Sequence, residues 1–400
     1  MVSIFYPPYA FGGDAIYLHR LCKELARRGH QVDVVHCADA FHLFRKDVDP
    51  SAFPDSEGIT VHRLETPWGP LGPLAAHQTG RPLLYRRRLS RILNSAPFDV
   101  VHFHNISLFG PQVLQLPLPA GAVRLYTAHD HWLVCPMSVL WKNRRQACDR
   151  PTCLSCTIRS HRPPQWWRYG SLLNRSAAAV DAFLAPSRFC AEMHRQRGFS
   201  RPIEVLNYFL QPAPEPAEST PPHPRPYFLF VGRLEKYKGL QDLLRAFEGD
   251  GGYDLLVVGA GGYEAELRAQ AAGQSRVHFA GWKNQTQIDP YYRHALAVVA
   301  PSVTYETFGL VVIEAYARQT PVIARRLGPL PEVIEEGRGG LVFGDQDELR
   351  RHLDRLADDA DLRQTLGRQG YEAFLAKWTP DPHIRRYVEI IERVRAQRSS

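Results

Sequence analysis

Two glutamates, Glu306 and Glu314, stand in the strongest chemical pattern of the chain, PSVTYETFGLVVIEAYARQTPVIA. The stretch predicts a strand, a loop carrying Glu306, a helix carrying Glu314 and a second strand. The backbone amides of Phe308, Gly309 and Leu310 fall at the predicted helix start, where they lack helical partners and attract an anion. We expect the two carboxylates to hold hydroxyl groups on either side of a phosphate, rather than to be an ordinary surface pair.

A second cluster of charge, VGRLEKYKG (231–239), follows another predicted strand. Arg233 lies at the strand end and Lys238 at the start of the next helix, so both side chains could face one phosphate region. Two cations there would offset the two negative charges of a diphosphate leaving group. The glycines on either side, Gly232 and Gly239, favour this interpretation over two surface cations.

Near the N-terminus, Gly12 and Gly13 follow the first predicted strand. Such a pair lets the backbone approach a ligand closely, although most pairs of this kind mark simple turns. The stretch is not G-x-G-x-x-G, so the sequence lacks the dinucleotide-binding fingerprint.

Histidines end two further predicted strands, as His102 and His104 in DVVHFH and as His129 and His131 in LYTAHDHW. One histidine at a strand end is often only a satisfied polar residue, whereas several that converge favour proton transfer or contacts with sugar hydroxyls. His129 is the strongest single candidate. A metal site made by His129 and His131 lacks a third ligand nearby in the sequence.

Seven cysteines, an odd number, occur in a chain whose N-terminus has no basic start and no small-residue cleavage site. We therefore expect no secretory signal and a cytoplasmic location. Four cysteines crowd together with the spacing C-x12-C-x4-C-x2-C: Cys135, Cys148, Cys153 and Cys156. Thiolates this close can hold a structural zinc ion or an iron–sulfur cluster, with zinc favoured, and four separate thiols or a transient disulfide are the alternatives.

These candidate residues follow strands that alternate with helices along the whole chain. In the first half the predicted strands are SIF, HQVDVVHC, DVVHFH, VRLYTAHD and DAFLAPS, with helices at 15–28 and 187–198. In the second half they are YFLFVGRL, YDLLVVGAG, VHFAGW, ALAVVAPS and PVIAR, with helices at 240–249, 309–319 and 382–397. The alternation predicts an α/β fold with parallel sheets covered by helices on both faces, and ligands at the carboxyl ends of the strands.

A proline-rich segment, residues 211–226, separates the two halves, and seven of its sixteen residues are Pro. It predicts a stiff, extended linker. We therefore expect an N-terminal domain (1–210) that contains the Cys-rich insert 135–156, a C-terminal domain (227–378) and a final helical segment (379–400). Two such domains imply a cleft between them.

The net charge of +8 is concentrated in the first half, where residues 1–210 hold 25 Lys/Arg against 15 Asp/Glu. A basic half could face nucleic acid, anionic lipid or a phosphorylated substrate, or could simply be a solvated surface. The densest cluster, residues 80–93, would form a basic amphipathic helix suited to a membrane surface, with Arg86, Arg87, Arg88 and Arg91 beside leucines. No nucleic-acid-binding motif and no apolar run of 18 residues is present, so we expect neither a nucleic-acid partner nor a membrane-spanning helix.

The quoted blocks resemble those of the family-4 retaining glycosyltransferases of the GT-B fold. PPYAFGGDAIYLHRLCKELARRGHQVDVV is similar to the opening strand, GG loop, helix and next strand of this family, and DVVHFH and LYTAHD to its middle strands. VGRLEKYKG and PSVTYETFGLVVIEAYARQTPVIA resemble its two donor-site blocks. The resemblance covers nearly the whole chain and implies two Rossmann-like domains with a cleft between them. The insert CPMSVLWKNRRQACDRPTCLSC lies outside the common core and resembles a Cys-bearing insert of some bacterial members.

The resemblance also implies roles for single residues. The catalytic pair would be His129, beside the donor sugar, and Glu306, on the hydroxyls of that sugar. Arg233 and Lys238 would neutralise the diphosphate and Glu314 would hold the ribose. The full set of implied donor-binding residues is Gly13, Arg233, Lys238, Phe308, Gly309, Leu310 and Glu314. Gly281 and Trp282 would border the base, and residues 383–397 would form a helix that returns to the first domain. One departure is Gln319, at a position that is usually small or Gly.

The implied reaction moves a sugar from a nucleoside-diphosphate sugar to an acceptor hydroxyl with retained anomeric configuration, in cell-surface polysaccharide or glycolipid synthesis. No cofactor or metal is expected for catalysis, in agreement with the lack of a DxD-type acidic motif. The expected partners are the donor, a lipid-linked or saccharide acceptor and the inner face of the cell membrane as a peripheral contact. The alternatives are a GT-B sugar-nucleotide epimerase and a non-catalytic basic protein that binds a membrane or nucleic acid.

Overall fold

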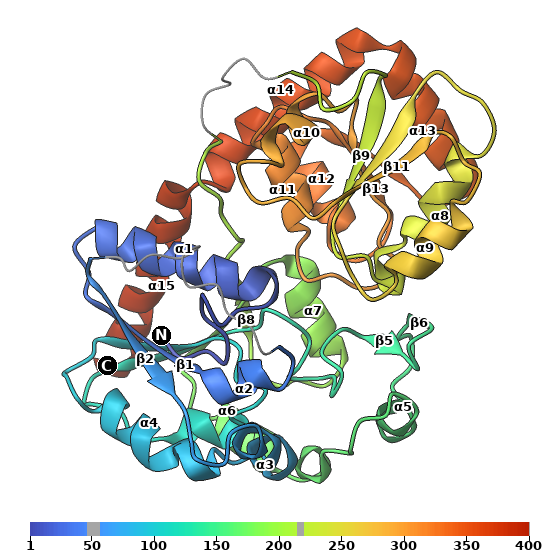
Figure 1. Ribbon diagram of the computed structural model, residues 1–400. Coiled ribbons are helices and arrows are strands. Elements are labelled where there is room, and N and C mark those ends of the chain that lie inside the picture. Colours follow the sequence, from blue (N-terminus) through green and yellow to red (C-terminus); the bar gives the residue numbers. More distant parts are fainter. Residues whose placement is uncertain (46–56, 214–219, 400) are drawn as a thin grey trace. The chain divides into compact units, whose positions relative to one another are not determined.

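The computed structural model describes residues 1–45, 57–213 and 220–399. The chain divides into two compact units (Figure 1). Unit 1 comprises Met1–Ser138, Pro151–Asn207 and His383–Ser400, and unit 2 comprises Val139–Arg150 and Tyr208–Pro382.

The boundaries of the units divide the expected insert and the expected final segment. Residues 139–150 of the predicted insert 135–156 belong to unit 2, and the rest of that insert belongs to unit 1. The predicted linker 211–226 lies partly outside the described residues, because 214–219 are among those not described.

Unit 1 is built on parallel strands. β1 (Val32–Cys37) pairs with β2 (Ile59–Leu64). A second group runs in the order β3 (Val100–Phe103), β4 (Val123–Thr127), β7 (Ala182–Ala185) and β8 (Ile203–Val205). Val2 makes parallel bridges to Val35 of β1 and Phe103 of β3, so the N-terminal segment joins the two groups. The strand expected at SIF is therefore reduced to the bridges of Val2, the residue directly before it.

Helices cover this sheet with their apolar sides. α1 (Gly12–Arg27) buries Leu18 and Leu21, and α4 (Arg86–Leu93) buries Leu89 and Leu93. α7 (Arg188–Gln196) begins after Ser187, whose hydroxyl accepts the backbone N–H of Cys190. Unit 1 also contains α2 (Ala38–His42), α3 (Leu71–Thr79), α5 (Cys153–Arg159), α6 (Leu172–Ala177) and the short 3-10 helices η2 (Leu83–Tyr85), η3 (Pro111–Gln115) and η4 (Trp166–Tyr169).

The last helix, α15 (Pro380–Ser399), contributes its residues from His383 onward to unit 1. Tyr17 of α1 shares a 3.1 Å hydrogen bond with His383, and Tyr387 shares one of 3.0 Å with His102 of β3. Figure 1 shows this helix, in red, passing beside the blue α1. The spacing of its buried residues, Ile384, Tyr387, Ile390 and Val394, gives one apolar face against the unit.

Unit 2 contains one six-stranded parallel sheet. Its order is β11 (Val277–Gly281), β10 (Asp254–Val258), β9 (Tyr227–Val231), β12 (Val298–Ala300), β13 (Val322–Arg325) and β14 (Gly340–Phe343). The strand order therefore reverses between β9 and β12. In open parallel sheets ligands bind outside the carboxyl ends of the strands at such a switch point.

Helices and one short hairpin complete unit 2. They are α8 (Leu240–Leu244), α9 (Glu264–Gln270), α10 (Asp289–Arg293), α11 (Leu310–Tyr316), α12 (Leu330–Gly337), α13 (Gln346–Asp358), α14 (Ala360–Lys377), η5 (Lys236–Lys238), η6 (Arg245–Phe247) and a hairpin of β5 (Trp141–Lys142) and β6 (Gln146–Ala147). The helix expected at 309–319 ends earlier, at Tyr316, and Gln319 takes a left-handed φ of 58°. That conformation explains why a small residue or Gly suits this position.

The predicted α/β fold with parallel sheets is confirmed. Among the helices in the described part of the chain, none is both long and apolar enough to cross a membrane.

Candidate functional site

The donor-side candidates of unit 2 meet at the switch point of its sheet. Lys238 ends η5, which follows β9, and Glu306 lies in the loop after β12, the strand that pairs with β9. The Nζ of Lys238 donates to Oε1 of Glu306 at 2.9 Å, and the hydroxyl of Ser302 donates to the same oxygen. Two residues 68 positions apart in the sequence are thus brought together.

The charges around Glu306 keep it ionised. Its side chain is only 15% exposed, and burial by itself would raise the pKa of Glu306. The attraction of Lys238 and the hydrogen bond from Ser302 outweigh burial, with a further contribution from Arg233, so the net pKa of Glu306 is lowered. Arg233 itself is exposed, and its guanidinium lies 5.8 Å from the ring centroid of Tyr237.

Two glycines allow the backbone to take this arrangement. Gly239 has a φ of +76°, and a Cβ there would lie 2.0 Å from the carbonyl oxygen of Pro301. Gly309 has a φ of +106°, and a Cβ there would lie 2.8 Å from Leu330. Only glycine tolerates both the left-handed backbone and the close approach. The loop bearing Lys238 can therefore lie against the end of β12.

α11 starts directly after Gly309, and no side chain in the described part of the chain caps its N-terminus. The N–H of Val312 in the first turn donates to the carbonyl oxygen of Gly309 at 2.9 Å. The expected anion site therefore depends on the amides of Phe308, Gly309 and Leu310. Phe308 is 2% exposed and packs edge-on against Tyr208, so its predicted contribution is through its backbone.

Glu314 lies in α11 and accepts a 2.7 Å hydrogen bond from the hydroxyl of Tyr292. This bond fixes one carboxylate oxygen. Trp282, expected near the base, is 68% exposed, beside Gly281 at the carboxyl end of β11. The structure thus places the unit 2 candidates at the carboxyl ends of β9, β11 and β12, or in α11, which follows β12.

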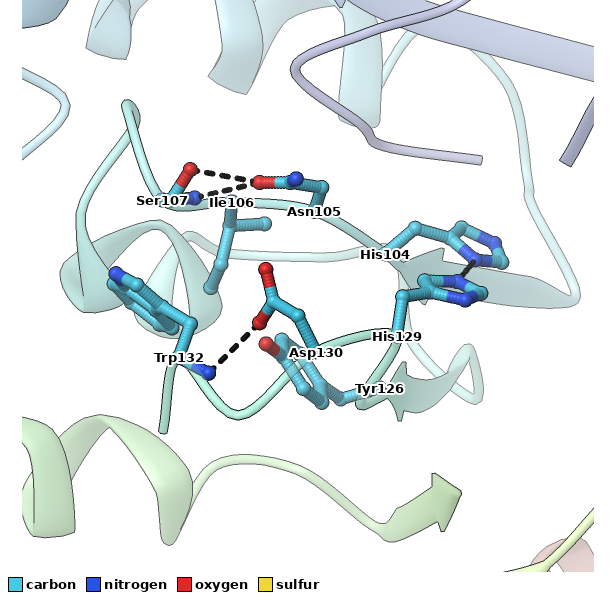
Figure 2. A pocket seen from close by; sticks show the side chains of 8 residues that line it. All are labelled: His104, Asn105, Ile106, Ser107, Tyr126, His129, Asp130 and Trp132. Carbon is cyan, nitrogen blue, oxygen red and sulfur yellow. Dashed lines mark hydrogen bonds between the residues drawn. The ribbon is translucent and has the colours of Figure 1, made fainter. Parts of the chain in front are cut away.

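The unit 1 candidates lie at the ends of its own strands. Gly13 is in the first turn of α1. His129 follows β4, and its Nε2 is 2.8 Å from Nδ1 of His104, which follows β3 (Figure 2). The two rings stack with centroids 5.1 Å apart. Sequence analysis named His104, but the direct bond between these two histidines was not predicted.

Burial keeps these histidines neutral. Burial lowers the pKa of His129 to about 3 and lowers the pKa of His104 well below its usual range. A neutral imidazole can donate one hydrogen bond and accept another, but it brings no positive charge. We therefore expect His129 to contact hydroxyl groups as a neutral ring.

Both rings line a small pocket in unit 1. Figure 2 shows the side chain of Asp130 projecting toward its middle. The pocket is lined by His104, Asn105, Ile106, Ser107, Tyr126, His129, Asp130 and Trp132. Asp130 was not among the predicted site residues, although its place directly after His129 at a strand end is a signal in the sequence.

Asp130 has an unusual charge state. Burial raises the pKa of Asp130 to about 7, the backbone N–H of Trp132 opposes this from 2.7 Å, and the nearby Asp14 carboxylate raises it again. A carboxyl that titrates near neutral pH can both donate and accept protons or hydrogen bonds. It is therefore chemically suited to a substrate hydroxyl.

His129 and His131 do not share a site. His131 lies with Cys190 and His194 of α7, in a group whose potential ligand atoms all lie within 4.8 Å of one another. The Nδ1 of His194 is 2.8 Å from the carbonyl oxygen of Cys190, four residues earlier, so that nitrogen makes a local backbone bond.

The four clustered cysteines form no disulfide with one another or with any other described residue. None of them belongs to a described group that brings three potential metal ligands within 4.8 Å. The zinc interpretation of Cys135, Cys148, Cys153 and Cys156 stays a prediction.

Each unit, taken by itself, offers groups suited to one kind of ligand. Unit 2 offers cations, helix amides and two carboxylates, which suit a phosphorylated, hydroxyl-rich ligand. Unit 1 offers neutral histidines and a carboxyl that titrates near pH 7, which suit hydroxyl groups.

Comparison with known proteins follows the same division. Residues 213–373 match the family described as Glycosyl transferases group 1, and residues 11–209 match the one described as Glycosyltransferase Family 4. The chain belongs to the family-4, group 1 glycosyltransferases. The two matches include all the candidate donor residues and His129, and the predicted class, a glycosyltransferase, is confirmed at the level of the family.

Individual relatives of this glycosyltransferase are distant. A stretch of 221 residues is 27% identical to the lipopolysaccharide core biosynthesis glycosyltransferase LpsE of Rhizobium meliloti (strain 1021), and covers 53% of this chain and 64% of LpsE. The match thus spans less than two thirds of that relative.

Solved structures share the fold over almost the whole chain. Sucrose-phosphate synthase from Thermosynechococcus elongatus has a TM-score of 0.73 at 22% identity, covering 99% of this chain and 98% of that one. Anabaena HepE, solved with UDP and glucose, has a TM-score of 0.66 at 16% identity, covering 98% and 99%. The predicted GT-B fold with two Rossmann-like domains is confirmed.

Proposed function

We propose that this glycosyltransferase moves a sugar from a nucleoside-diphosphate sugar to an acceptor hydroxyl with retention of the anomeric configuration. The observation that carries the proposal is the ion pair of Lys238 and Glu306 at the switch point of the unit 2 sheet, beside the uncapped start of α11. The negative charges of a diphosphate would be stabilised by Lys238 and by the backbone amides at the start of α11. The hydroxyl groups of a sugar would donate hydrogen bonds to the carboxylate of Glu306.

The roles follow from charge and position. Lys238 and Arg233 offset the charge that grows on the leaving diphosphate, which is the largest stabilisation available to such a reaction. Glu306, kept ionised by Lys238, accepts hydrogen bonds from the donor sugar. Glu314 is oriented by Tyr292 and accepts bonds from the ribose hydroxyls. Because the protein itself supplies cations, the proposed transfer needs no metal and no cofactor.

We propose that His129 contacts the donor sugar near the reacting centre, as the family resemblance implies, and that Asp130, in the same pocket, contacts the acceptor hydroxyl that attacks. Neutral His129 accepts or donates a hydrogen bond without adding charge, and Asp130 adjoins it in the same pocket. The similarity to LpsE supports an acceptor in cell-surface polysaccharide or glycolipid synthesis, including a lipid-linked one.

A lipid-linked acceptor fits a surface of unit 1 that would meet the inner face of the cell membrane. All four arginines of α4 are exposed, while its leucines face the core. Leu83 and Leu84 of η2, just before α4, remain exposed. We propose that these arginines and leucines form a peripheral contact with anionic lipid.

The test is a thermal-shift titration with UDP, GDP, ADP and CMP on the wild type and on Glu314→Ala. A nucleotide at about 100 times its Kd stabilises a single site by roughly 2.7 kcal/mol. One diphosphate should stabilise the wild type, and Glu314→Ala should respond less. The same nucleotide is then tested as a sugar conjugate for transfer, with the anomeric product read by NMR. Stabilisation by none of the four, together with no transfer from any sugar conjugate, would refute the proposal.

A further inference from the structure

A second cluster of chemically active side chains lies in unit 2, at the amino ends of its strands. Asp254 is the first residue of β10, His278 is near the start of β11, and His223 lies in the segment that leads into β9. The proposed donor residues lie at or beyond the carboxyl ends of the strands. The proposed reaction therefore makes no use of this cluster.

The geometry of the cluster is tight. The Nε2 of His223 lies 2.6 Å from Oδ2 of Asp254, and the Nε2 of His278 lies 3.0 Å from the same oxygen. The two imidazole rings have centroids 4.5 Å apart. Arg225 reaches the other oxygen, Oδ1, at 3.2 Å.

The buried carboxylate needs these partners. Asp254 is 1% exposed, and a carboxylate removed from water is costly unless it is paired. One arginine and two histidines contact this carboxylate, so it has three polar partners, whereas a single surface ion pair has one. Two imidazoles and one carboxylate, converging from three different segments, are also a common ligand set for Zn²⁺ and similar divalent ions.

The distances suit such an ion after a small adjustment. One potential ligand atom from each of the three residues lies within 4.8 Å of the others. Bonds of about 2.0–2.2 Å in a tetrahedral site place ligand atoms roughly 3.4 Å apart. The histidine nitrogens therefore need to move from Asp254 by less than about 1 Å.

We propose that His223, Asp254 and His278 bind a divalent transition metal ion, with Zn²⁺ as the best match. The side chain of His278 is 40% exposed, so the ion can enter from solvent and keep water as its remaining ligand. Arg225, 46% exposed, withdraws from Oδ1 as the ion replaces its positive charge. The bound ion links the segment before β9 to β10 and to β11, and so braces that side of the sheet.

The experiment titrates the metal-stripped full chain with Zn²⁺ alone and, separately, with Co²⁺ alone. His278→Gln is the matched variant, because its side-chain amide still offers an N–H to Asp254 but removes the imidazole ligand. Removing a residue that only hydrogen-bonds to a metal ligand typically weakens metal binding by about 10–100-fold. Removing the ligand itself should therefore weaken Zn²⁺ binding at this site by at least about tenfold. The rise in melting temperature caused by Zn²⁺ should shrink in the variant.

Two readouts separate this site from other metal binding by the chain. Co²⁺ bound by imidazole and carboxylate absorbs visible light but lacks the strong near-ultraviolet band that thiolate ligands give. His278→Gln should therefore lose visible Co²⁺ absorption without losing any near-ultraviolet absorption. Arg225→Gln, which removes a like charge, should bind Zn²⁺ as well as or better than the wild type. Equal Zn²⁺ affinity and stoichiometry in the wild type and His278→Gln would overturn the proposal, as would weaker binding in Arg225→Gln.

Discussion

Two carboxyl groups of this glycosyltransferase experience opposite electrostatics. Glu306 is held by Lys238 and Ser302, and its pKa is lowered despite burial. For Asp130, burial outweighs the hydrogen bond from Trp132 and the weaker attraction of Arg168, and raises its pKa to about 7. One group is therefore a permanent anion at neutral pH, while the other changes charge near pH 7. This difference separates a binding carboxylate from one that can exchange a proton.

Substituting Glu306→Gln should lower kcat/KM for transfer by about 100-fold, the scale found when one oriented group is removed from an active site. The amide keeps the shape but loses the charge that Lys238 and Ser302 orient. Steady-state kinetics with the donor that the nucleotide titration identifies would measure the loss. Glu335→Gln, on the exposed side of α12, removes an equal charge and should leave kcat/KM unchanged. Wild-type kinetics in Glu306→Gln would exclude a role for this carboxylate.

Asp130→Asn should change the pH dependence of stability. The ordinary pKa of an aspartate is 3.8, and the pKa of Asp130 in the folded protein is about 7. Between these two pH values the folded protein holds a proton on Asp130 that the unfolded chain has released. The contribution of this group to the free energy of unfolding is thus full below that window and falls as the pH rises through it. Asn cannot ionise, so the variant should gain stability relative to the wild type between pH 5 and pH 8 in urea unfolding. An equal difference at both pH values would contradict the raised pKa.

At the scale of elements, the loop that carries Lys238 depends on one glycine. Gly239→Ala should destabilise the protein by more than 2 kcal/mol, because its Cβ would collide with the carbonyl oxygen of Pro301 in addition to the left-handed strain of about 1–2 kcal/mol. Gly249→Ala is the matched control, since Gly249 has a φ of +74° and no atom within 4 Å of a Cβ. Chemical unfolding should show the larger loss in Gly239→Ala, with weaker nucleotide binding. Equal losses would mean that only the backbone angle matters.

The final helix is tied to unit 1 by the bond between Tyr387 and His102. Both residues are buried, so Tyr387→Phe leaves a buried ring nitrogen unsatisfied and should cost about 1–3 kcal/mol of unfolding free energy. Tyr371→Phe, in α14, removes the same hydroxyl from a half-buried ring and should cost less. Guanidinium unfolding of the two variants measures the difference. A negligible cost in Tyr387→Phe would show that apolar packing alone holds α15.

Continuous apolar strands were predictable, whereas exposed or very short ones were not. YFLFV and DLLVV are buried along their length and were assigned from composition alone. The sequence did not indicate β2, five of whose six residues are partly or fully exposed, or the three-residue β8. β14, which starts at Gly340, was missed because glycine disfavours strands in propensity terms.

The part of the candidate site that lies at the carboxyl ends of strands was predictable from the sequence. Parallel strands place their carboxyl ends at one edge, so Lys238 and Glu306 could be expected together. The bond between His104 and His129 depends on side-chain rotamers, and the cluster of His223, Asp254 and His278 joins segments up to 55 residues apart at the opposite edge. Neither leaves a local signal in the sequence.

At the scale of the whole molecule, charge is divided along the chain. Residues 1–210 carry ten more basic than acidic residues, and residues 211–400 carry two more acidic than basic ones. In the second half, a few cations close to the donor site are enough to offset the charge of a diphosphate. The excess positive charge of the first half attracts an anionic partner over a Debye length of about 8 Å at physiological salt. A salt-sensitive partner is therefore expected for the first half.

The arginines of α4 are the part of unit 1 expected to meet such a partner, a surface of anionic lipid. Replacing Arg86, Arg87, Arg88 and Arg91 by Gln should weaken binding to vesicles of anionic lipid by roughly a thousandfold at low salt, because each arginine near such a surface contributes about 1 kcal/mol. Cosedimentation measures it, and nucleotide binding should not change. Gln at four exposed arginines of unit 2, Arg350, Arg351, Arg355 and Arg368, removes equal charge as a control. If both quadruple variants lose binding equally, net charge rather than the α4 surface holds the protein to the lipid.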